Sequence, residues 1–243
     1  MNPTALITGA SKRIGKAVSQ HLAANGWNVI IHFNRSAEDA ITLVRKLGEK
    51  YPKQLFSSVT ANLSEGHEVE SLIPNIVSKS GPFELLINNA SVFDKSYLRE
   101  TSAKLFDSQL DVNLKAPFLL IRDFAVYCKK GNIINFVDTR ISGNTSNFAA
   151  YTLSKKALWE LTKMAALEFA PAIRVNAIAP GVTLAPVDED EDYLQNLAQN
   201  IPMKQPGGVV PILNSIDFIL KNTHLTGQLL FADGGENLGK NIE

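Results

Sequence analysis

The chain has 243 residues, of which 45% are hydrophobic and 20% charged, so it is long enough and apolar enough to bury a core as one domain. Its 24 basic and 24 acidic residues cancel to a formal net charge of zero, which argues against nucleic acid or an anionic membrane surface as a partner. A single cysteine, Cys128, excludes an intrachain disulfide, and the four histidines are not spaced as metal ligands, so we expect no metal site.

Apolar runs and amphipathic runs alternate along the chain. The runs predict seven strands, at residues 4–8, 28–33, 54–60, 83–87, 132–137, 173–178 and 228–231. Amphipathic helices are predicted at residues 12–25, 37–50, 65–80, 102–129 and 151–169. Alternation at this spacing favours an α/β fold, in which helices cover both faces of a parallel sheet.

The sequence predicts neither a membrane span nor a signal peptide. No apolar run reaches the length of a membrane span, and residues 1–4 lead directly into the first strand without a signal peptide. We therefore expect a cytoplasmic protein with a single domain over residues 1–243.

Ligands of open α/β sheets bind at the carboxyl ends of the strands. Gly9, Asn88, Asp138 and Pro180 all fall at predicted strand ends. The sequence therefore predicts one site along that edge of the sheet.

A glycine turn joins the first predicted strand to the first helix. Residues 8–15 read Thr-Gly-Ala-Ser-Lys-Arg-Ile-Gly, and the free N–H groups and positive dipole end of a helix start there suit a phosphate. The spacing of Gly9 and Gly15 is not that of G-x-G-x-x-G, because Arg13 replaces a glycine, and tight turns need glycine without any ligand. A cation at Arg13 opposes the helix dipole, so its position indicates an anionic or carbonyl-bearing partner.

The end of the second strand selects between the two nicotinamide dinucleotides in folds of this kind. No Asp or Glu occurs in residues 28–37, whereas Arg35 and Ser36 follow the strand about twenty residues beyond Gly15. Because a guanidinium binds a 2′-phosphate bidentately, we expect NADPH to be preferred over NADH. A simple loop cation is the alternative for Arg35.

The stretch 138–155 is where we expect the chemistry. Tyr151 and Lys155 lie four apart at the start of a helical pattern, roughly 6 Å apart along the axis on one face. The ammonium is expected to lower the pKa of the phenol toward neutrality, which makes it a proton donor at physiological pH. The pair by itself also occurs on ordinary amphipathic helices.

Together these motifs resemble the short-chain dehydrogenase/reductase superfamily. They are Thr8-Gly9-Ala10 with Gly15, Asn88-Asn89-Ala90, Asn113, Tyr151-x-x-x-Lys155, Pro180-Gly181 and Asp233-Gly234-Gly235, in family order over nearly the whole chain. The resemblance implies a Rossmann-type, doubly wound sheet, an NAD(P)-dependent oxidoreductase and a dimer or tetramer. It also implies that Asn113, Tyr151 and Lys155 belong to the catalytic tetrad.

One departure narrows the resemblance. Thirteen residues before Tyr151, where most members carry serine, this chain has Asp138. With Arg13, Arg35 and residues 88–93, it looks like the pteridine reductase branch. That likeness implies that Asp138 and Tyr151 contact the reacting edge of a pterin. It further implies that Phe93 stacks on the ring, that Ser91 hydrogen-bonds cofactor or substrate, and that Arg13 reaches the pterin and the pyrophosphate.

Residue types support these roles, and each has a plain alternative. An ionisable carboxyl can pair with an amino–imine edge, and Phe93 offers a flat apolar face. Asp138 is otherwise a turn-forming residue, and Phe93 is otherwise core packing. Where the family commonly has Asp near the adenine, this chain has Asn62, so we expect that contact to be altered rather than lost.

The expected contacts fall into two sets. For the cofactor they are Gly9, Ser11, Lys12, Arg13, Ile14, Gly15, Arg35, Ser36, Asn62, Asn89, Ala90, Tyr151, Lys155, Pro180 and Gly181. For the substrate they are Arg13, Ser91, Phe93, Asp138, Tyr151, Leu184 and Pro186.

Pro117 sits four residues after Asn113 and lacks an N–H, so it frees the Asn113 carbonyl. A water held there would relay protons to Lys155, although a Pro kink that merely shapes the helix is the alternative. Residues 181–208 are polar and rich in Pro and Gly, which suits a substrate lid; the acidic run 188–192 within them is read as a solvated patch. Apolar residues on more than one face of helix 151–169 fit an oligomer, preferably a homotetramer, or simple burial.

We therefore expect an NADPH-dependent reductase of a pterin, dihydropterin or dihydrofolate, with Tyr151 as proton donor. A carbonyl reductase of 3-oxoacyl or small keto substrates is the alternative within the same class. Carrier-protein substrates are acidic, and the absence of a basic surplus argues mildly against them. A non-catalytic NADP(H) sensor or scaffold is the alternative of a different class, disfavoured by an intact Asn113, Tyr151 and Lys155.

Overall fold

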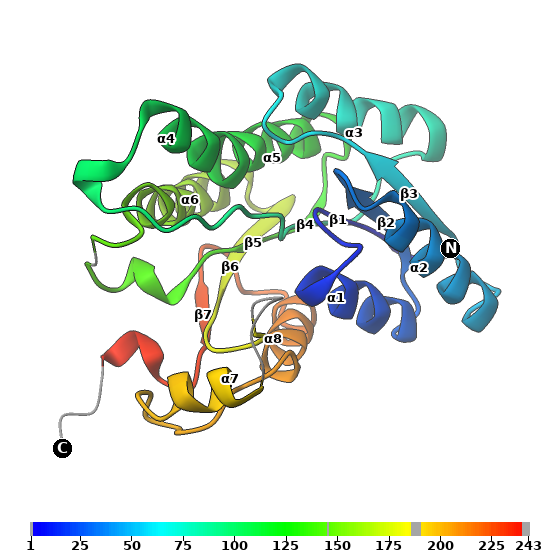
Figure 1. The fold of residues 1–243 in the computed structure, drawn as a ribbon. Helices are drawn as coiled ribbons and strands as arrows, with labels where there is room; N and C mark the ends of the chain where they lie inside the picture. The colour runs from blue at the N-terminus through cyan, green and yellow to red at the C-terminus, as the bar shows by residue number, and fades with distance from the viewer. Residues whose placement is uncertain (1, 145, 186–190, 240–243) are drawn as a thin grey trace.

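The structure, a computed structural model, describes residues 2–144, 146–185 and 191–239. Its centre is a sheet of seven parallel strands in the order β3-β2-β1-β4-β5-β6-β7 (Figure 1). The strands are β1 Thr4–Ile7, β2 Asn28–Phe33, β3 Phe56–Thr60, β4 Leu85–Asn88, β5 Gly131–Phe136, β6 Ile173–Pro180 and β7 Leu229–Ala232. The order in which strands are added to the sheet reverses between β1 and β4, and such sheets bind ligands at this switch point.

Helices cover both faces of the sheet, as Figure 1 shows. They are α1 Arg13–Ala24, α2 Ala37–Lys50, α3 Gly66–Ser80, α4 Ala103–Leu110, α5 Ala116–Tyr127, α6 Ala149–Phe169, α7 Glu191–Ala198 and α8 Val210–Lys221. One core packs α3, α5 and α6 against the sheet through side chains such as Leu72, Phe124 and Ala165. The other packs α1, α2 and α8 through side chains such as Leu22, Leu43 and Ile216.

The inner strands of the sheet are largely apolar because both of their faces are buried, whereas the edge strands β3 and β7 are partly exposed. Leu6 and Ile7 of β1 are both fully buried, and they lie in different cores because successive side chains point to opposite faces. The predicted doubly wound α/β fold is therefore confirmed, with the strand ends near Gly9, Asn88, Asp138 and Pro180 at one edge.

The long helix predicted over residues 102–129 differs in detail. It is α4 and α5 joined by a π-helical turn, η2 Asp111–Lys115, in which the Ala116 N–H donates to the Asp111 carbonyl. Asn113 lies at the centre of this turn, and π turns inside helices concentrate at functional sites.

Two helices near the carboxyl end were not predicted. The helix α8 begins beside Pro211, after a stretch dense in Pro and Gly that reads as loop. Proline is tolerated in a first helical turn, and Ile212, Ile216 and Ile219 then bury one face at helical spacing. Among the helices of the described residues, none is long and apolar enough to cross a membrane.

Candidate active site

The glycine turn after β1 is held from two sides. Gly9 adopts φ +61, and a Cβ on Gly15 would lie 2.3 Å from the Gly9 carbonyl, so the turn packs directly on the start of α1. The Asn89 amide donates to the carbonyls of Thr8 (2.8 Å) and Gly9 (3.2 Å). Asn89, which directly follows β4, therefore holds the turn from the side of that strand.

His32 in β2 fixes the other side of the turn. Its Nδ1 accepts the Gly9 N–H at 3.2 Å, so Nε2 carries the ring proton and donates to the Ala61 carbonyl at 3.1 Å. Burial lowers the pKa of His32 from 6.5 to about 4. The neutral ring thus ties β1, β2 and β3 together where the turn begins.

A hollow of about 670 Å³ opens beside the turn at the end of β2. Among its lining residues are Ser11, Lys12, Arg35 and Ser36. The Ser11 and Ser36 hydroxyls lie 2.6 Å apart, and the Lys12 ammonium pairs with Asp39 at 3.0 Å. Arg35 is exposed at the rim, so the predicted phosphate-binding guanidinium lies next to the glycine turn. Asn62 lies nearby after β3, where its side-chain oxygen accepts from the Ser64 hydroxyl and N–H.

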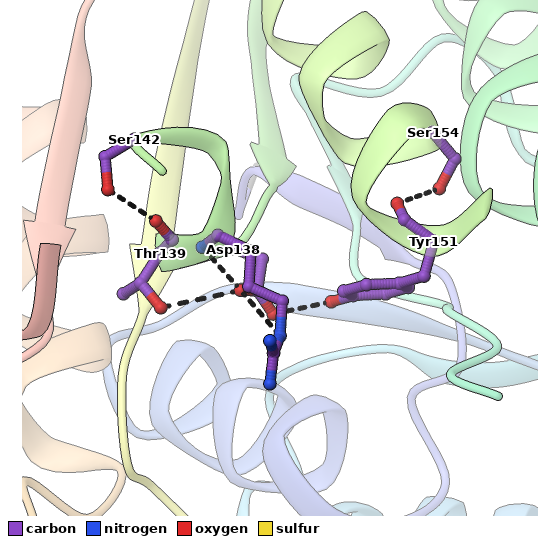
Figure 2. Close-up of polar contacts among 6 residues, drawn as sticks. Asp138, Thr139, Ser142, Tyr151 and Ser154 are labelled. Atoms are coloured by element: carbon purple, nitrogen blue, oxygen red, sulfur yellow. Dashed lines mark hydrogen bonds and ion pairs between the residues drawn. The ribbon is translucent and has the colours of Figure 1, made fainter. Parts of the chain in front are cut away.

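Tyr151 and Asp138 face each other across the mouth of the sheet (Figure 2). The Tyr151 hydroxyl donates to Asp138 Oδ2 at 2.7 Å, while Asp138 Oδ1 accepts the Arg140 N–H at 2.8 Å as the N-cap of the short helix η3 Thr139–Ile141. Lys155 is buried one turn further along α6 and donates to the Phe136 carbonyl at 2.9 Å. The three predicted catalytic side chains of this stretch are thus brought together.

The expected lowering of the Tyr151 pKa is wrong for the protein alone. Burial raises the pKa of the phenol well above its ordinary value, and the Asp138 charge and hydrogen bond raise it further, against a smaller lowering by Arg140 and Ser91. The Lys155 ammonium lies 5.8 Å from the centre of the Tyr151 ring, and burial lowers its own pKa to about 8. The carboxylate is closer to the phenol than the ammonium is, so it dominates.

Asn113 ties the loop after β4 to the π turn. Its Oδ1 accepts the Val92 N–H at 2.9 Å and the Ser91 hydroxyl at 3.1 Å, and its Nδ2 donates to the Val92 carbonyl at 2.9 Å. Nδ2 also lies 3.2 Å from both Gln109 Oε1 and Ser154 Oγ. Asn113 is therefore a buried staple that fixes the loop carrying Phe93.

Phe93 does not pack in the core. It is 52% exposed, stacks face to face on Phe148 at 4.3 Å, and meets the Tyr151 ring edge-on at 4.6 Å. The Arg140 guanidinium carbon lies 4.4 Å from the centre of the Phe148 ring. An aromatic surface therefore stands directly beside the phenol and the carboxyl.

Arg13 reaches the segment that follows β6. It has φ 50 at the first position of α1, and its guanidinium donates to the carbonyls of Leu184 (3.1 Å) and Ala185 (2.8 Å). Gly181 lies against Asp233, where a Cβ would come within 2.6 Å of the Asp233 Cα. The other predicted contact in this segment, Pro186, lies outside the described residues.

The motif order and this geometry agree with comparisons to known proteins. A model of the short chain dehydrogenase family matches residues 3–194. The chain belongs to this family. As a member it is an oxidoreductase.

Three relatives of this short-chain dehydrogenase bear on its substrate. The chain is 32% identical to the 3-oxoacyl-[acyl-carrier-protein] reductase FabG of Staphylococcus epidermidis, over 97% of this chain and 99% of the relative. It is 30% identical to pteridine reductase 1 of Leishmania tarentolae, over 97% and 96%. It superposes on FolM alternative dihydrofolate reductase 1 of Brucella suis, solved with NADP, with a TM-score of 0.93 at 32% identity over 99% and 97%.

Sequence reasoning missed four residues that shape the site of this dehydrogenase. His32, Arg140, Phe148 and Glu236 carry no motif of their own, and their contacts are visible only after the chain has folded. Burial, aided by the charges of Asp138 and Asp233, raises the pKa of Glu236. Arg140 has a local signal, because it stands two residues after the unusual Asp138. Within the described residues, no group of His, Cys, Asp and Glu side chains is arranged to hold a metal ion.

Proposed function

We propose that this short-chain dehydrogenase is an NADPH-dependent reductase of a pterin, dihydropterin or dihydrofolate. The observation that carries the proposal is the carboxyl of Asp138, held 2.7 Å from the Tyr151 hydroxyl and next to the exposed ring of Phe93. A carboxyl and a flat apolar face are what a planar heterocycle with a polar edge requires. A small keto substrate has no ring for Phe93 to stack on.

The residues at the end of β2 fit NADPH. The Gly9–Gly15 contact leaves no room for a side chain between the turn and α1, so a pyrophosphate can approach the backbone there. Arg35 and Ser36 stand at the rim of the adjoining hollow, in position for a 2′-phosphate. Solved relatives from two Brucella species are described with NADP. When bound, the cofactor supplies a hydride to a ring carbon of the substrate.

Proton transfer falls to the chain's own side chains. With its pKa raised, Tyr151 keeps its proton at neutral pH and gives it to the ring nitrogen beside the carbon that receives the hydride. Asp138 accepts the Tyr151 hydrogen bond and positions the amino–imine edge, so the phenol is aimed at the substrate. Lys155 holds the nicotinamide ribose and, as a cation, stabilises the phenolate that is left. Asn113 keeps the π turn and the Phe93 loop in register, and a water at its carbonyl returns a proton through Lys155.

The substrate lies between the aromatic surface and the segment after β6. Phe93 stacks on the pterin ring, Ser91 hydrogen-bonds its edge, and Leu184 closes the site from the other side. Arg13 holds the backbone at Leu184 and faces the pyrophosphate. The lid is proposed over residues 181–208, of which 186–190, with most of the acidic run, lie outside the described residues. In the described part, the Gly207 N–H donates to the Val182 carbonyl at 3.0 Å, which ties the two ends of the segment together.

A reductase of 3-oxoacyl substrates is the second candidate, because the relatives at 32% identity include enzymes of that name. Asp138, in place of the serine common in the family, speaks against it. The deciding experiment follows NADPH oxidation with dihydrobiopterin and dihydrofolate, against an acetoacetyl thioester. Turnover of a dihydropterin supports the proposal, turnover of the thioester alone supports the second candidate, and turnover of neither favours a cofactor sensor.

The dehydrogenase is also proposed to form a homo-oligomer, with a tetramer preferred. Exposed apolar side chains gather on α5 and α6, among them Phe118, Met164 and Leu167, at 52%, 66% and 86% exposure. Phe118 and Met164 line a groove of about 770 Å³ between α4, α5 and α6. A contiguous apolar patch of this kind marks a protein–protein contact.

A further inference from the structure

Arg140 and Phe148 take no part in the proton transfer proposed above, yet both contact the groups that do. Arg140 lies in η3, two residues after Asp138, and Phe148 immediately precedes α6. The Arg140 Nε lies 4.0 Å from Asp138 Oδ1, the same oxygen that accepts the Arg140 N–H at 2.8 Å. On its other side the guanidinium carbon lies 4.4 Å from the centre of the Phe148 ring and 5.7 Å from that of Phe93.

These contacts close into a ring of five side chains. Arg140 packs on Phe148, and Phe148 stacks on Phe93 at 4.3 Å with only 8° between the ring planes. Phe93 meets Tyr151 edge-on at 4.6 Å, and Tyr151 donates to Asp138 at 2.7 Å, which returns to Arg140. The carboxyl and the aromatic surface are therefore joined twice, once through Tyr151 and once through Arg140 and Phe148.

The second link matters because Phe93 comes from an irregular loop. A half-exposed ring on a loop changes rotamer readily unless one of its faces is already occupied. Phe148 covers one face of Phe93, so the opposite face is presented in a fixed plane. The main chain supports the same arrangement, since the Ala149 N–H donates to the Ser96 carbonyl at 3.3 Å and so anchors the far end of the loop beside Phe148.

We propose that Arg140 and Phe148 are specificity-determining positioning residues, which lock the Phe93 ring and the Asp138 carboxyl into one geometry that selects a planar, polar-edged heterocycle over a flexible acyl substrate. The inference rests on the proposed function for the identity of that heterocycle. It does not depend on which pterin is reduced.

The positive charge of Arg140 provides a second test, because it acts on the pKa of Tyr151 and not on the stacking of Phe93. The charged groups that act on Tyr151 or Asp138 are Lys155 from α6, Arg140 from η3, and Glu236, on which Asp233 acts in turn. Arg140 lowers the pKa of the Tyr151 phenol against the opposing Asp138. Loss of this cation therefore raises the pKa of the proton donor, whereas loss of the Phe148 ring leaves it where it is.

Three variants separate charge from stacking. Arg140→Leu removes both, Arg140→Lys keeps the charge but loses the planar stack, and Phe148→Leu removes the ring alone. All three are expected to raise KM for dihydrobiopterin about 3- to 10-fold, the loss of one stacking contact. The kcat/KM profile is expected to fall in two alkaline steps, the first from Lys155 near pH 8 and the second, taken as the basic limb, from Tyr151. Arg140→Leu is expected to move this basic limb up by about half a pH unit to one unit, and the other two variants leave it in place.

Arg45→Leu is the matched control, because Arg45 is an exposed arginine of α2 outside the site, and it is expected to change neither parameter. KM for an acetoacetyl thioester is expected to stay within about twofold in every variant, since that substrate does not use the stack. An Arg140→Leu enzyme with unchanged KM and an unmoved basic limb overturns the inference. So does a fall in kcat and thermal stability with both of those readouts unchanged. If the wild type reduces the thioester and no dihydropterin, the proposed function fails, and the basic limb measured on the thioester then decides the role of Arg140.

Discussion

Asp138 carries the proposed preference for a pterin over an acyl substrate, and its charge can be removed at constant size. Asp138→Asn is expected to reduce dihydropterin turnover roughly 100-fold, because the substrate edge loses its ionic partner and the phenol its orientation. The Asp138 charge raises the pKa of Tyr151, so the basic limb of the rate profile is expected to move to lower pH. Steady-state rates against pH measure both effects.

A second substitution at Asp138 tests its effect on substrate preference. Asp138→Ser restores the residue common in the family and is expected to gain activity on an acetoacetyl thioester while losing it on dihydropterin. Asp107→Asn on the exposed side of α4 is the control. Full dihydropterin activity in Asp138→Asn would remove Asp138 from the chemistry.

Arg35 is expected to set the cofactor preference. Arg35→Ala should weaken NADPH about 10- to 100-fold, the loss of one charge-assisted hydrogen-bond pair, and leave NADH nearly unchanged. Fluorescence titration of both cofactors measures the effect. Arg45→Ala, which removes the same charge from an exposed position of α2, is the control. Equal affinities for the two cofactors in the wild-type protein would contradict the assignment.

His32 makes folding depend on pH through its buried neutral ring. Its pKa falls from 6.5 in the unfolded chain to about 4, so the unfolded state binds the proton first and stability is lost as pH falls from 6.5 toward 4. The loss is on the order of 3 kcal/mol. Other groups contribute to the same slope, so the measurement is the difference in urea unfolding between wild type and His32→Asn, at neutral pH and near pH 5.

The two stability curves are expected to converge as pH falls, since only the wild type loses the contribution of His32. His224→Gln, at an exposed histidine, is expected to stay parallel to the wild type throughout. Curves for His32→Asn that also stay parallel would mean that His32 is not held neutral by the fold.

Among single residues, the sequence predicts those that belong to a motif. It does not predict the residues that hold the motif residues in place. Tyr151 and Lys155 are found from their spacing together with the family resemblance, which also singles out Asp138, and the helix and the strand end bring the three side chains together. Phe148 and Arg140 act through contacts with a distant loop, and no local pattern encodes those contacts. The sign of the Tyr151 shift was wrong for the same reason: burial and the nearer carboxylate depend on tertiary packing.

Among the elements, the strands and the first three helices follow from apolar periodicity, whereas the π turn and α8 do not. Period-based reasoning treats residues 102–129 as one helix, since an extra residue in one turn hardly disturbs the pattern. The helix α8 is hidden by the proline and glycines before it, although its isoleucines are spaced to bury one face. The π turn is missed where a predicted helix changes its winding, whereas α8 is missed along its whole length.

The π turn places Asn113 against the loop after β4 that carries Phe93. Asn113→Ala tests whether Asn113 holds this loop. The variant loses the bonds to Ser91 and Val92 and leaves buried polar groups unpaired, so we expect a loss of about 2–4 kcal/mol and a rise in substrate KM that exceeds any change in NADPH affinity. Ser154→Ala removes the bond from Asn113 Nδ2 and the bond that the Ser154 hydroxyl donates to the Tyr151 carbonyl, but it keeps the bonds to Ser91 and Val92. It is the matched control, with a smaller stability loss and unchanged KM. Equal effects on both parameters in the two variants would show that Asn113 supports the core and not the loop.

At the scale of the whole molecule, exposed apolar side chains of α5 and α6 form a surface. On α6, Leu153, Met164 and Leu167 repeat at helical spacing and are all more than half exposed, and Phe118 and Val126 of α5 extend the surface. Figure 1 shows α4, α5 and α6 grouped together at one end of the sheet. Exposed apolar stripes on adjacent helices are costly in water unless another subunit covers them.

Self-association through this face predicts which substitutions break the oligomer. Phe118→Glu combined with Leu167→Glu is expected to lower the mass measured by sedimentation equilibrium by at least half. The reason is that a carboxylate buried in an apolar interface loses its hydration and gains no partner. Leu55→Glu, at a similarly exposed leucine before β3, is the control and is expected to keep the wild-type mass. Because an oligomer gains stability by mass action, the melting temperature of the wild type should rise with protein concentration and that of the double variant should not. A wild type that sediments as a monomer, with a concentration-independent melting temperature, would contradict this assembly while leaving the chemistry at Tyr151 untouched.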